Sequence, residues 1–378
     1  MKRMKKAFIL LCIFSLIGVC VIPAGADSSV ELPSDFAGMM DSLPDEVRSV
    51  LPDGLFSSDT DDVALAVDEL TSVRGLLACL SELVGVRLSS CRGMLATCLG
   101  LVLFSAFFTR LCEYFGGKSH KTLNFCARLC IFSAVVSSGY LSISGIAMYF
   151  EQLTALITSA LPLTCTLYSL GGNIGAAAAN NSALTLALTV CGDLCGKTVV
   201  PVFCVCLCFA LLGVFGEGID LGGLSSVVKK AWLWLIGIIT LILSASLAFQ
   251  TTLASRGDSI GMRGAKYAAG SIIPVVGGTV AGTLGTVAAS VEYLRATVGI
   301  CGVILIFLML IPSFLNVMLT RLIYSVSSGI ASALGCGSES RLFSELAGLY
   351  GYIAAAECLC SIVFILEFAL LAGCACAV

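Results

Sequence analysis

The chain has 378 residues, of which 58% are apolar and only 12% are charged, with a formal net charge of −3. Soluble domains carry about 25% charged residues, so this composition excludes an ordinary water-soluble protein and indicates a membrane protein. Its mean hydropathy of +1.02 agrees with that reading. The sequence lacks a basic patch of the kind that binds nucleic acid, and no nucleic-acid partner is expected.

Residues 1–26 have the pattern of an export signal. A basic start at residues 2–6 precedes an apolar run over 7–22, and Ala24-Gly25-Ala26 forms a small-residue cleavage site. We therefore predict a signal peptide. An uncleaved first helix is the alternative, because the apolar run is long for a signal.

Residues 27–92 are predicted to form a small, acidic, helical, extracytoplasmic head. They contain thirteen Asp or Glu and only four Lys or Arg. Prolines divide residues 27–60 into short pieces, whereas residues 61–86 predict one longer helix with apolar side chains recurring every seven residues. This stripe could pack on the protein itself or dock a partner's domain, and the sequence favours neither.

Residues 93–378 are predicted to form a multi-span helical membrane domain, which makes the fold all-α and polytopic. Crossing a bilayer takes about 20 apolar residues. The first three spans are expected at 93–108, 129–149 and 153–170. The basic loop over 110–128 should face the cytoplasm if the head is exported.

The apolar stretch 183–215 is too long for one straight span and too short for two. Asp193, Gly196, Lys197 and Pro201 should break it into a half-helix, a kink and a full helix. Asp193 and Lys197 are four residues apart, so they share a helical face and can neutralise each other. Alternatively, the two residues have a function and form a polar position along a path for a solute or ion.

A clean span is expected over 231–253, followed by the unusual segment 263–287. Its six glycines suit closely packed helices, as in Gly278-x3-Gly282, or a helix broken inside a protein-lined cavity. Its notable residues are Arg263, Lys266, Tyr267, Gly270, Pro274, Gly277, Gly278, Gly282 and Gly285. Whether this segment crosses the membrane or re-enters it decides on which side of the membrane the later loops and the C-terminus lie.

Spans at 298–318 and 349–372 complete the membrane domain, with an amphipathic interfacial helix expected over 319–334. Glu357 and Glu367 both fall inside the last span. A charge at the bilayer centre costs roughly 2.5–3.5 kcal/mol. Each carboxyl group should therefore be protonated, paired or facing a wet cavity.

The sequence contains no recognisable catalytic, cofactor or metal site. His120 is the only histidine, and a nucleotide-binding P-loop is absent. Cys191 and Cys195 would share a helical face, but zinc usually takes four convergent ligands. We interpret the twenty cysteines as small buried apolar residues. The protein is not expected to be an enzyme.

One series of motifs resembles a known family. Arg263-x-Ala-Lys266-Tyr267 is followed by Gly270-x3-Pro274-Val-Val-Gly277 and later by Gly299-x-Cys-Gly302-Val303. This order resembles the stage III sporulation protein AE family, the polytopic member of the channel complex between mother cell and forespore. The resemblance implies a multi-pass protein in the mother-cell membrane that surrounds the forespore.

The resemblance also implies partners. They are membrane lipid, the other stage III sporulation A proteins, including a secretion-type ATPase and ring-forming members, and indirectly stage II sporulation protein Q. Its role would be a platform or pore element that supports forespore development after engulfment, and self-association is possible. The rival hypothesis is a self-contained secondary transporter with broken helices around its substrate site.

Overall fold

The computed structural model describes residues 35–57, 60–115, 119–170, 174–215, 223–245 and 277–373, and these ranges contain helices and turns but no strand. Six of the described helices are long and apolar enough to cross a membrane: Cys91–Leu111, Phe132–Leu170, Asn181–Ala210, Gly223–Ala245, Ser290–Ala333 and Gly337–Ala372. The all-α, multi-pass fold is therefore confirmed. The expected signal peptide and residues 246–276, with Arg263 to Pro274, lie outside the described residues.

Short helices precede the bundle: α2 (Asp35–Asp41), α3 (Asp45–Arg48), the 3-10 helix η1 (Asp53–Phe56) and α4 (Thr60–Thr71). They bury their apolar side chains, among them Met39, Leu55 and Val67. Helix α2 packs against α6, where the Ser42 and Ser159 hydroxyl oxygens are 3.1 Å apart. The described residues before α5 therefore pack onto the bundle of the same chain.

The single helix predicted over 61–86 is divided at Ser72. Its hydroxyl donates to the Glu69 carbonyl oxygen at 2.6 Å and accepts a hydrogen bond from the Gly75 amide at 3.0 Å. One side chain thus ends α4 and caps the next helix. That helix, α5 (Val73–Phe115), continues without a break into the first membrane span.

The two spans predicted at 129–149 and 153–170 are one helix, α6 (Ser119–Leu170), with Pro162 inside it. Proline removes a single backbone hydrogen bond from a helix. Neighbouring turns remain packed, since Leu163 and Leu167 are fully buried. Pro162 therefore does not end the helix. At 1.5 Å per residue, the 52 residues of α6 extend about 78 Å, more than twice the thickness of a bilayer core.

The break predicted near Asp193 is present as a turn of π-helix. Helix α7 (Ile174–Thr189) leads into η2 (Val190–Gly196), and α8 (Lys197–Phe215) follows directly. A π-helical turn accommodates an extra residue without stopping the helix, and such turns often lie at functional sites. The polypeptide thus passes through the bundle as one interrupted helix.

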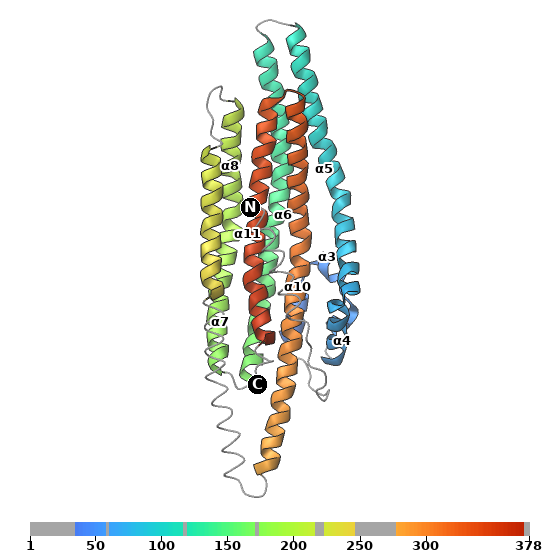
Figure 1. Cartoon of the computed structure of the whole chain (residues 1–378), viewed down its shortest axis with the longest axis vertical. Coiled ribbons are helices and arrows are strands. Elements are labelled where there is room, and N and C mark those ends of the chain that lie inside the picture. Colours follow the sequence, from blue (N-terminus) through green and yellow to red (C-terminus); the bar gives the residue numbers. More distant parts are fainter. Residues whose placement is uncertain are drawn as a thin grey trace.

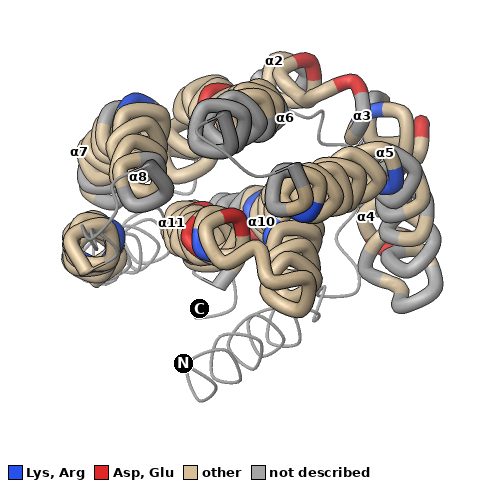
Figure 2. Tube along the Cα trace, turned by 90° about the horizontal axis from the view of Figure 1, so that it is seen from above, with Lys and Arg blue, Asp and Glu red and all other residues tan. Residues whose placement is uncertain are grey.

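The final two helices form the centre of the fold. They are α10 (Gly277–Ala333) and α11 (Gly337–Gly373), joined by a turn in which Gly335 has φ 81°. The separate amphipathic helix predicted over 319–334 is the last part of α10, because its buried face continues the packing stripe of the span before it. In Figures 1 and 2, α11 stands in the middle of the bundle, between α10 on one side and α7 and α8 on the other.

Contacts along α11 fix the direction of its neighbours. The helix over 223–245 runs parallel to α11, because its Lys229 contacts Glu345 and its Gly237 faces Leu359. Helix α10 is antiparallel, and its Gly299 lies against Ala372 near the end of α11. Residues 245 and 277, the described residues on either side of the gap in the description, therefore lie at the same end of the bundle.

Candidate functional site

Glu357 is the central polar residue of the membrane domain. Its side chain is 0% exposed, and Oε1 accepts a hydrogen bond of 2.7 Å from the Ser313 hydroxyl of α10. Oε2 is buried and has no hydrogen-bond partner among the described residues. Ionisable groups inside membrane bundles are rare and costly, and they commonly mark functional positions.

One turn further along α11, Ser361 extends this polar site to α6. The Ser361 hydroxyl donates to the Glu357 backbone oxygen at 2.7 Å, and its oxygen lies 2.5 Å from the Tyr149 hydroxyl. Tyr149 and Ser361 are both buried. Three helices, α6, α10 and α11, are thus joined by side-chain hydrogen bonds at one level of the bundle.

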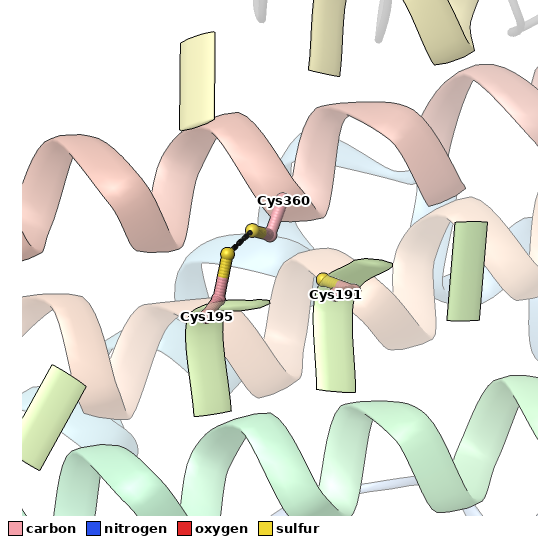
Figure 3. A group of neighbouring side chains, drawn as sticks. All are labelled: Cys191, Cys195 and Cys360. Atoms are coloured by element: carbon pink, nitrogen blue, oxygen red, sulfur yellow. Dashed lines mark hydrogen bonds between the residues drawn. The ribbon is translucent and has the colours of Figure 1, made fainter. Parts of the chain in front are cut away.

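Three thiols lie beside this site, on η2 and α11. The Sγ atoms of Cys191, Cys195 and Cys360 all lie within 4.8 Å of one another, and all three residues are buried. Figure 3 shows Cys195 and Cys360 pointing at each other, with their Sγ atoms 3.0 Å apart. We call these residues the thiol cluster. A small pocket adjoins it, lined also by Ala187, Val190, Leu194, Ile236, Thr240, Leu243, Val363 and Phe364.

The sequence predicted only part of the thiol cluster. The spacing of Cys191 and Cys195 predicts a shared face, whereas Cys360 is 165 residues from Cys195 along the chain. Among the described residues, these thiols form the group close enough together to hold a metal ion. Three ligands are fewer than the four of a closed zinc site.

The predicted intramembrane polar residues have different surroundings. Glu357 and Glu367 are both 0% exposed on α11. Lys197 is exposed at the first residue of α8, and the Asp193 side chain lies outside the described residues, so their ion pair stays a prediction. Gly277, Gly278, Gly282 and Gly285 lie in the first turns of α10.

Sequence reasoning did not predict that Lys229 and Arg295 are buried. The Lys229 ammonium donates to Glu345 Oε2 at 2.5 Å, and Ser225 donates to the same oxygen at 3.1 Å. Arg295 is buried, with its guanidinium carbon 4.6 Å from the centre of the Tyr168 ring. Nothing in the sequence indicates which of the adjacent Lys229 and Lys230 is buried. Lys229 is buried because it faces α11, whereas Lys230 is exposed.

Glycines in α10 explain the close packing of the two central helices. A Cβ atom on Gly299 would lie 2.7 Å from the Ala372 backbone nitrogen, and one on Gly302 would overlap the Phe368 ring. Small residues of this kind let membrane helices approach backbone to backbone. Both glycines belong to the motif Gly299-x-Cys-Gly302-Val303, which now has a structural reason.

Comparison with known proteins gives a family match. The family model for stage III sporulation protein AE matches residues 65–375. Stage III sporulation protein AE of Bacillus subtilis (strain 168) is 24% identical over 233 residues, which cover 61% of this chain and 58% of that protein. The match thus spans less than two thirds of the relative's length. No solved structure matches the chain.

Proposed function

The chain belongs to the stage III sporulation protein AE family, and from that premise we propose that it is a membrane component of the channel complex between mother cell and forespore. It supports forespore development after engulfment. The observation that carries this proposal is the family match across all six membrane-spanning helices. Its partners are the other stage III sporulation A proteins, including the ATPase and the ring-forming members, with stage II sporulation protein Q reached indirectly.

The protein lies in the mother-cell membrane around the forespore, with its acidic head outside the cytoplasm. One group of basic residues supports this orientation. Helix α5 ends, and the helix over 223–245 and α11 begin, at the end of the bundle opposite the head, and Arg110, Lys229, Lys230 and Arg341 belong to those parts of the three helices. Lys and Arg concentrate on the cytoplasmic side of membrane proteins.

Within the complex the chain acts as a platform. Large side chains fill the space around α11, and Tyr350, Phe364 and Phe368 are each 0–1% exposed. A solute path would then run between this protein and its neighbours or between copies of it. Helix α5 offers a face for such contacts, because Phe104 and Phe107 are exposed on it.

Deletion of the gene tests the proposal. Sporulating cells would be followed by microscopy with a membrane dye and a late forespore reporter. We expect engulfment to finish and forespores then to stay small or collapse, with a silent reporter. Normal heat-resistant spores would refute a role in the complex.

A secondary transporter is the second candidate, favoured by the π-helical interruption at η2. Broken helices at mid-membrane form the substrate sites of many transporters. Ion-coupled uptake by the purified protein alone in liposomes would support that candidate. Uptake that requires the partner proteins would support the platform.

A further inference from the structure

We propose that the thiol cluster is a reversible oxidation site in which Cys195 and Cys360 form a disulfide between η2 and α11. The geometry is nearly in place. The two Sγ atoms are 3.0 Å apart in the reduced protein. A disulfide bond is about 2.05 Å long, so the two sulfur atoms must approach by about 1 Å. Cys195 is 1% and Cys360 3% exposed, which leaves their sulfur atoms few alternative partners.

The chemistry of the surroundings favours a disulfide over a metal ion. Binding a metal requires thiolates, and three thiolates around one monovalent or divalent cation leave a net negative charge. Among the described residues that line the pocket, Thr240 is the one polar residue apart from the cysteines, and none is Lys or Arg. An uncompensated charge in apolar surroundings is costly, whereas a disulfide is neutral.

Hydrogen peroxide is a suitable oxidant, because it is about as small as water and the pocket adjoins the sulfur atoms. The Cys195 sulfur attacks one peroxide oxygen, the O–O bond breaks, and a sulfenic acid and one water form. The Cys360 sulfur then attacks the sulfenic sulfur and displaces its hydroxyl group, which leaves as a second water with the thiol proton. Two thiols and one peroxide thus give one disulfide and two waters.

Cys191 supplies a way to exchange the bond. It lies one helical turn before Cys195 on η2 and within 4.8 Å of the other two sulfur atoms. In the exchange its sulfur attacks Cys360, Cys191–Cys360 forms, and the Cys191 proton passes to the released Cys195, so that no charge remains in the apolar site. Either disulfide ties the interrupted helix α7–η2–α8 covalently to the central helix α11.

The test uses the full-length protein purified in lipid nanodiscs, without and with hydrogen peroxide. Free thiols are then alkylated, the protein is digested without reductant, and cross-linked peptides are identified by mass spectrometry. We expect peroxide to produce a peptide linking Cys195 to Cys360 that dithiothreitol removes. Cys360→Ser should abolish the linked peptide. Cys301→Ser, which changes another buried thiol on α10, should leave it unchanged.

Three results would overturn the inference. Both thiols could remain available for alkylation after peroxide and unfolding, or they could be oxidised only to sulfinic acids. Metal analysis could instead find zinc or copper in the purified protein that is lost in Cys360→Ser, which would identify a metal site. Because the assay follows wild-type protein, its outcome does not depend on the folding of any variant, nor on the proposed role in sporulation.

Discussion

Replacing Gly299 with alanine should loosen the contact between the two central helices. The new methyl group would lie 2.7 Å from the Ala372 nitrogen and 2.8 Å from both the Ala372 Cβ and the Phe368 carbonyl oxygen. Two of these three atoms belong to the backbone of α11. No side-chain rotation can move them, so the helices themselves must separate.

The size of the effect follows from two opposing contributions. Alanine favours a helix over glycine by about 1 kcal/mol. Ordinary van der Waals contact needs about 3.4 Å, so α10 and α11 must separate by about 0.7 Å, and overpacking of this kind costs typically 1–3 kcal/mol. We expect a net loss of up to about 2 kcal/mol in the free energy of unfolding.

Gly329→Ala is the matched control. Gly329 lies on the same helix, and nothing is within 4 Å of the position its Cβ would take. It should therefore gain up to about 1 kcal/mol from helix propensity alone. Unfolding of each purified variant in the same detergent, followed by circular dichroism, gives the comparison. If Gly299→Ala is as stable as Gly329→Ala, the close approach of α10 and α11 is wrong.

Substitutions of three buried residues, Glu357, Lys229 and Tyr149, test the buried polar contacts by the same unfolding assay. Glu357→Gln keeps an acceptor for Ser313 and should change stability by less than about 1 kcal/mol, whereas Glu357→Ala leaves a cavity and should cost about 2–4 kcal/mol. Equal losses of stability in the two Glu357 variants would contradict this expectation. Lys229→Met should cost about 1–3 kcal/mol by leaving its carboxylate partner on α11 without a cation, and the exposed Lys230→Met should cost almost nothing. Tyr149→Phe should cost about 1 kcal/mol by removing the hydroxyl that meets the serine of α11, and an unchanged stability would mean that this hydrogen bond contributes nothing.

Composition and hydropathy were enough to predict the fold class, but not where helices continue. Pro162 and the boundary near residue 319 both look like ends of helices, yet α6 and α10 pass through them. The packing of a whole helix against its neighbours outweighs a single residue that disfavours the helix, and this packing cannot be predicted from the local sequence. The break near Asp193 was predicted because several unfavourable residues fall within one or two turns.

The candidate site was predictable only in part. Glu357 stands out because a carboxyl group in an apolar span needs an explanation, and it is indeed at the centre of the polar site. Ser313, which donates to Glu357, and Tyr149, which meets Ser361, carry no such signal, since serine and tyrosine are common in membrane helices. Cys360 and Cys195 are 165 residues apart in the chain, and a single sequence taken by itself gives no information on such long-range pairs.

The length of α10 has a mechanical consequence. It is one helix of 57 residues, about 85 Å long, which touches α4 of the head and ends at the turn beside Gly335. From Gly299 to the turn it is packed along α11, with Ser313 hydrogen-bonded to Glu357 and Ser328 hydrogen-bonded to Ser340. Its first turns, from Gly277, extend past the end of α11 (Figure 1). A bend of about 5° at Gly299 would move Gly277, about 33 Å away, by about 3 Å, while the part packed on α11 stays in place. Spin-label distances to α11 should therefore change at the start of α10 and not near Gly335 when a partner binds the head; equal changes at both ends would mean that the whole helix moves.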